Sequence, residues 1–127
     1  MRRIYLALPT NEDRAIIAYN NGVRLFEADE FKFAIEYFTE AIELDGEFSE
    51  AYANRGACWG ELEAYERAFA DYDKALALNP EDALSLSNRG CDWHGLGDLS
   101  KAIADLDKAI HFNPRFAGAY SNRGAVW

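Results

Sequence analysis

The chain has 127 residues, half of them hydrophobic, and a formal charge of −9. This length suffices for one domain. The acidity argues against a nucleic-acid partner and against an anionic membrane surface, because both are bound mainly through Lys and Arg. Residues 15–48 and 49–82 each hold eight acidic residues, against two and three basic ones, so electrostatic steering favours a basic partner at this half.

The N-terminal extension, residues 1–14, begins with basic and then apolar residues. Its apolar run, Ile4 to Leu8, is shorter than the roughly 7–15 residues of a secretory signal, and no apolar run is long enough to cross a bilayer. Cys58 and Cys91 have no CxxC spacing and resemble small apolar residues in a reducing compartment. We therefore expect a cytoplasmic protein.

The rest of the chain has the periodicity of α-helices, and the predicted helices are arranged in pairs. The first helix of each pair is predicted at residues 11–28, 49–62, 83–96 and 117–127, and the second at residues 31–44, 65–78 and 99–112. Thr10 and Asp13 have the spacing of a capping box. Pro80 and Pro114 end two of the second helices, because proline has no backbone N–H to donate.

The pairs repeat with a period of 34 residues. Glycines recur at this spacing, as Gly22, Gly56, Gly90 and Gly124. In the second helices, alanines at i and i+7 flank a large apolar residue at i+4: Ala34, Phe38 and Ala41; Ala68, Tyr72 and Ala75; Ala102, Leu106 and Ala109. The sequence resembles the tetratricopeptide repeat family, whose 34-residue unit is a helix–turn–helix with this pattern. The resemblance covers residues 15–127.

The resemblance implies an all-α fold, a right-handed solenoid of antiparallel helix pairs. An extension with a helix cap (1–14) precedes three repeats (15–48, 49–82 and 83–116), and residues 117–127 form the first helix of a fourth, truncated repeat. Small residues at the shared positions let neighbouring helices approach closely. This packing offsets the cost of about 1 kcal/mol for a glycine inside a helix.

Charged residues vary together between the repeats. Arg55 and Arg89 occur where the second helix carries aspartates, Asp71 with Asp73 and Asp105 with Asp107, whereas the first repeat has Asn21 with Tyr37 and Thr39. Antiparallel packing brings these positions close, so we predict an ion pair within each of the two repeats. Its contribution to stability depends on its burial.

No catalytic, cofactor or metal site is expected. The sequence has no GxxxxGK[ST], GxGxxG or HExxH motif. Cys91 and His94 share a helix face, but a metal needs three or four protein ligands and the only other histidine, His111, falls on a different helix. We therefore expect a chain that is not an enzyme.

The resemblance implies that the first helices line a concave peptide groove. An asparagine lies there once per repeat, and its amide can both donate to and accept from a peptide backbone; the superhelix of O-linked N-acetylglucosamine transferases is similar in using an asparagine ladder. The predicted groove residues are Asn20, Asn54, Asn88 and Asn122 with Tyr19, Val23, Phe26, Leu84, Cys91 and His94. Alternatively, the asparagines bond neighbouring helix backbone and are structural.

One branch of the family clamps the C-terminal carboxylate of heat-shock proteins with Lys, Arg and Asn in set rows. The Lys and Arg positions here hold Tyr19, Leu84 and Asn88, and only Asn54 matches. We therefore do not expect a carboxylate clamp.

Two functions remain. The first is a protein–protein interaction scaffold that binds an extended, neutral-to-basic peptide in the concave groove. The alternative is a self-assembly module that forms a homo-oligomer through its unfinished C-terminal repeat, with Tyr120 and Trp127 at the contact, because repeat arrays normally end in a polar capping helix.

Overall fold

The computed structural model describes residues 7–115. In this part of the chain there are six helices and no strand: α1 (Asn11–Glu27), α2 (Phe31–Leu44), α3 (Ser49–Glu61), α4 (Tyr65–Leu78), α5 (Ala83–Gly95) and α6 (Leu99–Phe112). The predicted bounds agree with these to within one residue. The predicted helix at 117–127 lies outside the described residues.

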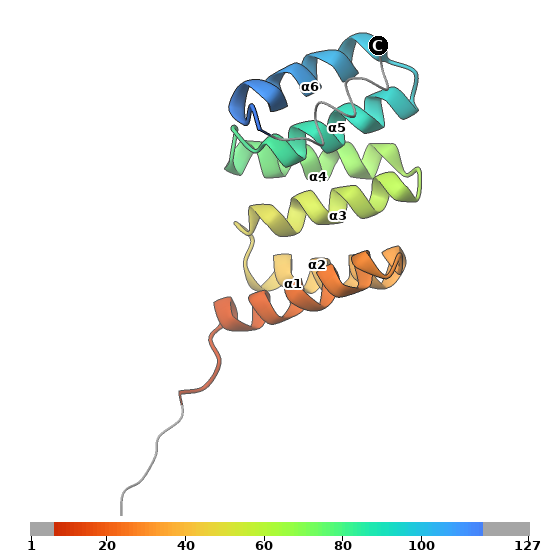
Figure 1. Ribbon diagram of the computed structural model, residues 1–127. Coiled ribbons are helices and arrows are strands. Elements are labelled where there is room, and N and C mark those ends of the chain that lie inside the picture. The colour runs from red at the N-terminus through yellow and green to blue at the C-terminus, as the bar shows by residue number, and fades with distance from the viewer. Residues whose placement is uncertain (1–6, 116–127) are drawn as a thin grey trace, which may run out of the picture.

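The helices form antiparallel pairs that stack in chain order (Figure 1). Each helix contacts the next one along the chain. In addition, α3 contacts both α1 and α5, whereas within the described residues α4 contacts neither α2 nor α6. The first helices of the pairs therefore lie closer together than the second helices, so the stack is an all-α solenoid with α1, α3 and α5 on its inner side.

Local interactions set where helices begin and turn. The capping box at α1 is confirmed: the Asp13 backbone N–H donates to Thr10 Oγ1, and the Thr10 N–H donates to Asp13 Oδ2, both at 3.1 Å. The turn inside each pair has one residue with positive φ, at Asp29 (59°), Glu63 (59°) and Gly97 (85°). These positions are 34 residues apart, so the repeat extends to the backbone conformation of the turn.

The two helices of each pair meet where the shared glycine faces a large side chain. A Cβ atom at Gly56 would lie 2.7 Å from Tyr72 Cε1 and 3.2 Å from the Ala68 carbonyl oxygen. Gly22 has the same relation to Phe38, and Gly90 to Leu106. All three of these large side chains are at most 1% exposed, so they form the centre of the core. The glycine thus sets how closely each pair can pack.

The predicted ion pairs are confirmed, and they extend further than predicted. Arg55 donates from Nε and Nη2 to the two oxygens of Asp71, both at 2.8 Å, and from Nη1 to Thr39 Oγ1 at 3.2 Å. Arg89 likewise binds both oxygens of Asp105, at 2.7 and 2.8 Å, and donates from Nη1 to Asp73 Oδ1 at 3.0 Å. Each arginine therefore joins its own repeat to the preceding one.

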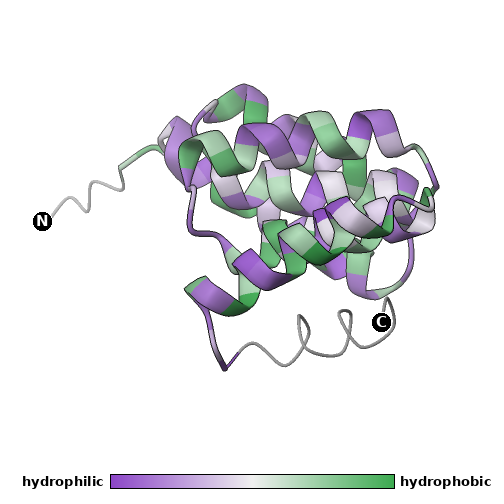
Figure 2. Cartoon of the chain, turned by 90° about the horizontal axis from the view of Figure 1, so that it is seen from above, coloured by the Kyte–Doolittle hydropathy of each residue, from purple (hydrophilic) through white to green (hydrophobic). Residues whose placement is uncertain are grey.

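Apolar residues alternate with polar ones along every helix, as expected for helices with one buried face (Figure 2). The buried apolar residues are mostly alanines between the helices, with one large residue in each of the first two pairs, Phe38 and Tyr72, and two in the third, Leu86 and Leu106. Among the described residues, every helix is too short or too polar to traverse a bilayer.

The contact between Gly56 and Tyr72 gives a direct test of the packing. Gly56→Ala should destabilise the chain by up to about 2 kcal/mol, because overpacking a buried ring costs about 1–3 kcal/mol and the gain in helix propensity offsets only about 1 kcal/mol of it. Gly46→Ala, in the turn between α2 and α3, is the control for the added methyl group, since a Cβ atom there meets only the Ile42 carbonyl oxygen at 4.0 Å. Urea unfolding measures both. An unchanged or raised midpoint for Gly56→Ala would contradict the packing described.

Candidate functional site

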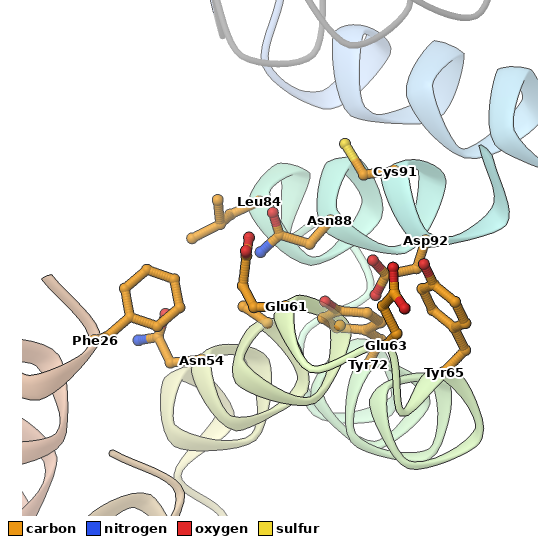
Figure 3. A pocket seen from close by; sticks show the side chains of 12 residues that line it. Phe26, Asn54, Glu61, Glu63, Tyr65, Tyr72, Leu84, Asn88, Cys91 and Asp92 are labelled. Atoms are coloured by element: carbon orange, nitrogen blue, oxygen red, sulfur yellow. The ribbon is translucent and has the colours of Figure 1, made fainter. Parts of the chain in front are cut away.

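A groove of about 480 Å³ lies on the inner side of the solenoid. It runs from the end of α1 across α3 to α5, with residues of the α3–α4 turn and of α4 at one end (Figure 3). Its walls combine amides, aromatic rings and carboxylates. The lining residues are Phe26, Asn54, Ala57, Gly60, Glu61, Glu63, Tyr65, Tyr72, Leu84, Asn88, Cys91 and Asp92.

Five of the predicted groove residues line this groove. Asn54 comes from α3, while Leu84, Asn88 and Cys91 come from α5, and Phe26 closes the end formed by α1. Leu84 keeps 44% of its surface exposed, which gives the groove an accessible apolar side. The helix register therefore places these side chains together although they come from three repeats.

The other predicted residues lie elsewhere. Asn20 and His94 are exposed and do not line the groove. Tyr19 and Val23 pack against the buried cluster of Ala34, Phe38 and Cys58. Asn122, predicted for the groove, and Tyr120 and Trp127, predicted for self-association, lie outside the described residues.

Tyr19 and Asn54 connect the first two repeats. The Asn54 side-chain amide donates to the Tyr19 hydroxyl at 2.8 Å. The Tyr19 ring packs against Phe48, with the ring centroids 4.9 Å apart. Burial raises the pKa of Tyr19, the hydrogen bond from Asn54 opposes this rise, and the charge of Glu50 adds to it. One N–H of Asn54 is therefore used within the chain, and among residues 7–115 its carbonyl oxygen and second N–H have no further hydrogen bond, so they can bind another partner.

The sequence prediction did not include the acidic and tyrosine residues at the far end of the groove. They are Glu61, Glu63, Tyr65, Tyr72 and Asp92. One signal was available in the repeat register: Asp92 is 34 residues after Cys58, which is fully buried against α2. The third repeat therefore has a carboxylate at the position where the second repeat has a buried thiol, and a carboxylate is much more costly to bury.

Asp92 lies in the contact between the second and third repeats. Its carboxylate occupies the space above Gly60, where a Cβ atom would be 2.5 Å from Oδ2. That oxygen is shielded from solvent and has no hydrogen-bond partner among the described residues. Burial raises the pKa of Asp92 to about 6; a hydrogen bond with the Tyr72 hydroxyl lowers it and the charge of Glu61 raises it.

The cysteines have no features of a nucleophile. Burial raises the pKa of the Cys58 thiol to about 12, with a further rise from the charge of Glu61. Burial, together with the charge of Asp92, raises the pKa of Cys91 in the same direction. Both thiols are therefore protonated at neutral pH, the form that reacts slowly. Within residues 7–115 no three His, Cys, Asp or Glu side chains are grouped so as to hold a metal ion.

The sequence model of the tetratricopeptide repeat matches residues 49–82, the second of the repeats described above. The same helix pair recurs on either side of it with a 34-residue period. The chain therefore contains a tetratricopeptide repeat at residues 49–82. No curated protein sequence matches it significantly.

Solved tetratricopeptide repeat domains share the whole fold. The domain of Arabidopsis OM64 superposes with a TM-score of 0.87 at 24% identity, over 91% of this chain and 96% of that one. The first domain of Spaghetti (RPAP3), bound to the HSP90 peptide SRMEEVD, gives 0.85 at 21% identity, over 94% and 95%. The second domain of human RPAP3, in complex with the HSP70 peptide SGPTIEEVD, gives 0.83 at 25% identity, over 91% and 97%.

The raised pKa of Asp92 predicts a pH-dependent stability of this repeat stack. The folded state holds the proton more tightly than the unfolded chain, so the contribution of Asp92 is favourable at low pH. It decreases as the pH rises from about 4 to about 6. Asp92→Asn lacks this titration. The melting temperature of the variant minus that of the wild type should therefore grow between pH 4 and pH 6 and stay constant above.

Melting curves at intervals of half a pH unit measure this difference. Glu36→Gln, a charge-matched change at an exposed position of α2, serves as the control and should show no such trend. A difference for Asp92→Asn that is the same at every pH would mean that Asp92 titrates normally.

Proposed function

We propose that the chain is a protein-interaction module whose inner face binds an extended peptide segment of another protein. The observation that carries this proposal is the groove, which Asn54 and Asn88 from successive repeats both line. The two side chains lie one repeat apart, and each amide can donate to and accept from a peptide backbone unit. Leu84 and Phe26 add apolar surface for side chains beside that backbone.

The similar domains support this use of the fold. Two of them are in complex with heat-shock peptides, SRMEEVD and SGPTIEEVD, so this architecture binds short peptides in those proteins. Those peptides are acidic at their C-terminal ends. The residues that line the described groove include three carboxylates, Glu61, Glu63 and Asp92, and no Lys, Arg or His. We therefore propose a neutral or basic peptide as the partner, as opposite charges favour association.

The alternative, self-assembly through residues 117–127, concerns residues outside those described, and it stays a prediction. Sedimentation over a range of protein concentrations separates the two alternatives. A mass that stays that of one chain as the concentration rises would contradict self-assembly, whereas a mass that increases with concentration would support it.

The test begins with a selection of random twelve-residue peptides on phage, followed by synthesis of the recovered peptides with a fluorescent label. Replacing both Asn54 and Asn88 with Ala should weaken binding of these peptides by about 1–3 kcal/mol, roughly five- to 150-fold in affinity, because each lost hydrogen bond contributes about 0.5–1.5 kcal/mol. Fluorescence anisotropy measures the affinity, and circular dichroism checks that the variant remains helical.

Asn21→Ala is the matched control, since Asn21 lies on α1 outside the groove and bonds Arg24. It should leave the affinity unchanged. Equal binding by the wild type and the double variant would show that the peptide does not use these amides. Loss of the helical signal in the double variant would show that the asparagines are structural.

A further inference from the structure

The end of the groove formed by α3, α4 and α5 differs in chemistry from the rest. Asn54, Leu84 and Phe26 lie toward one side, whereas Asp92, Tyr65 and Tyr72 gather at the other (Figure 3). Carboxylates and tyrosines line this second end, which we call the acidic end of the groove; it consists of Gly60, Glu61, Glu63, Tyr65, Tyr72 and Asp92. Such a set of groups accepts hydrogen bonds from a cation and presents aromatic carbon to it.

The position of Asp92 is fixed by packing. Gly60 leaves room above α3, and the Asp92 carboxylate fills that room, with both oxygens within 2.7 Å of where a Cβ atom would stand. The ring of Tyr72, which is 1% exposed, forms the floor below it. The carboxylate, which comes from the third repeat, is thus packed against the backbone and the core of the second repeat.

The carboxylate is short of partners. Oδ2 is shielded from solvent and makes no hydrogen bond within the described residues, and no Lys, Arg or His of residues 7–115 lines the groove to neutralise the charge. A buried carboxylate without a counter-charge is costly, and a cation that reaches it recovers part of that cost. Glu61 and Glu63 at the rim attract the same sign of charge toward this end.

Tyr65 completes the walls. Its hydroxyl reaches α5, where a Cβ atom at Gly95 would be 2.6 Å from the Tyr65 oxygen, so the ring spans the gap between the two repeats beside Asp92. Burial raises the pKa of Tyr65, as do the charges of Glu63 and Asp92, which places both carboxylates near it. The ring is therefore in a position to pack against a flat cationic group.

We propose that the acidic end of the groove is a subsite for one basic side chain, Arg or Lys, of the bound peptide, with Asp92 as the group that accepts its charge. This inference rests on the proposed function, because the subsite is part of the same groove. It makes the groove selective for basic peptides, in contrast to the acidic peptides in the complexes of the similar domains.

The experiment uses pools of nine-residue peptides in which the centre is fixed and the other positions are randomised over neutral residues. The centre is Arg, Lys, citrulline, norleucine or Glu; citrulline has the shape of Arg without its charge. Each pool is passed over the immobilised chain, and the captured peptide is quantified. The wild type should retain about tenfold more of the Arg and Lys pools than of the citrulline and norleucine pools.

Asp92→Asn should abolish this preference while retaining the neutral pools, because Asn keeps the size of the side chain but replaces the charged carboxylate by a neutral amide whose NH2 group donates and cannot accept from a cation. Glu36→Gln, which makes the same charge change on the exposed face of α2, should preserve it. A preference that survives in Asp92→Asn, or that decreases equally in both variants, would overturn the subsite in favour of general charge attraction. Equal retention of the Arg and citrulline pools by the wild type would also overturn it.

Capture of the neutral pools without any preference would leave the proposed function standing and remove only the subsite. If none of the pools were retained, the proposed function would fail and the subsite with it.

A second readout is the pH dependence of the preference. The titratable groups that face Asp92 are Glu61 on α3, Glu63 in the turn, Tyr65 and Tyr72 on α4, and Cys91 on α5. The raised pKa of Asp92, about 6, means that the wild type should lose preference for the Arg pool between pH 7 and pH 5, as the carboxylate becomes neutral. A wild-type preference that is constant over this range would contradict the assignment to Asp92.

Discussion

The close approach of a glycine to a large buried side chain holds each helix pair together. Gly56 lies so near the Tyr72 ring that a single added carbon would overlap it, and Gly22 and Gly90 repeat the arrangement with Phe38 and Leu106. Because this contact brings the helices of a pair together, the alanines beside it can be fully buried and the next pair can stack on top. The inner row of α1, α3 and α5, and with it the groove, follows from this spacing.

The side chains at the junctions between repeats determine the chemistry of the groove. On one side of the stack, Arg55 and Arg89 each bind a carboxylate of their own repeat, Asp71 or Asp105, which is 5% exposed. Each arginine also reaches the preceding repeat, through Thr39 or Asp73. On the other side, the position that buries Cys58 between the first two repeats holds Asp92 between the second and third. The same fold therefore has an apolar contact at one junction and an acidic one at the next.

The periodicity of the sequence predicted much of the fold. Helix bounds, the capping box at Thr10 and the Arg–Asp pairs follow from spacing, because residues with the same register have the same neighbours. How deeply a side chain is buried does not follow from its position in the repeat. Tyr19 and Val23 stand at repeat positions predicted to line the groove, but they pack against the core, where Phe38 and Phe48 are the large neighbouring residues. The positive φ of Asp29 and Glu63 was indicated in the sequence only by the glycine at the equivalent position of the third repeat, Gly97.

The central claim is that the inner face of the solenoid binds peptide, and amide chemical shifts measured while a selected peptide is titrated into the isotope-labelled chain test it most directly. The account predicts that the largest changes fall on the helices that line the groove, at and around Asn54, Glu61, Asn88 and Asp92. Changes confined to the outer helices, for example around Glu36 and Lys108, would contradict it, because those residues lie on α2 and α6, outside the groove.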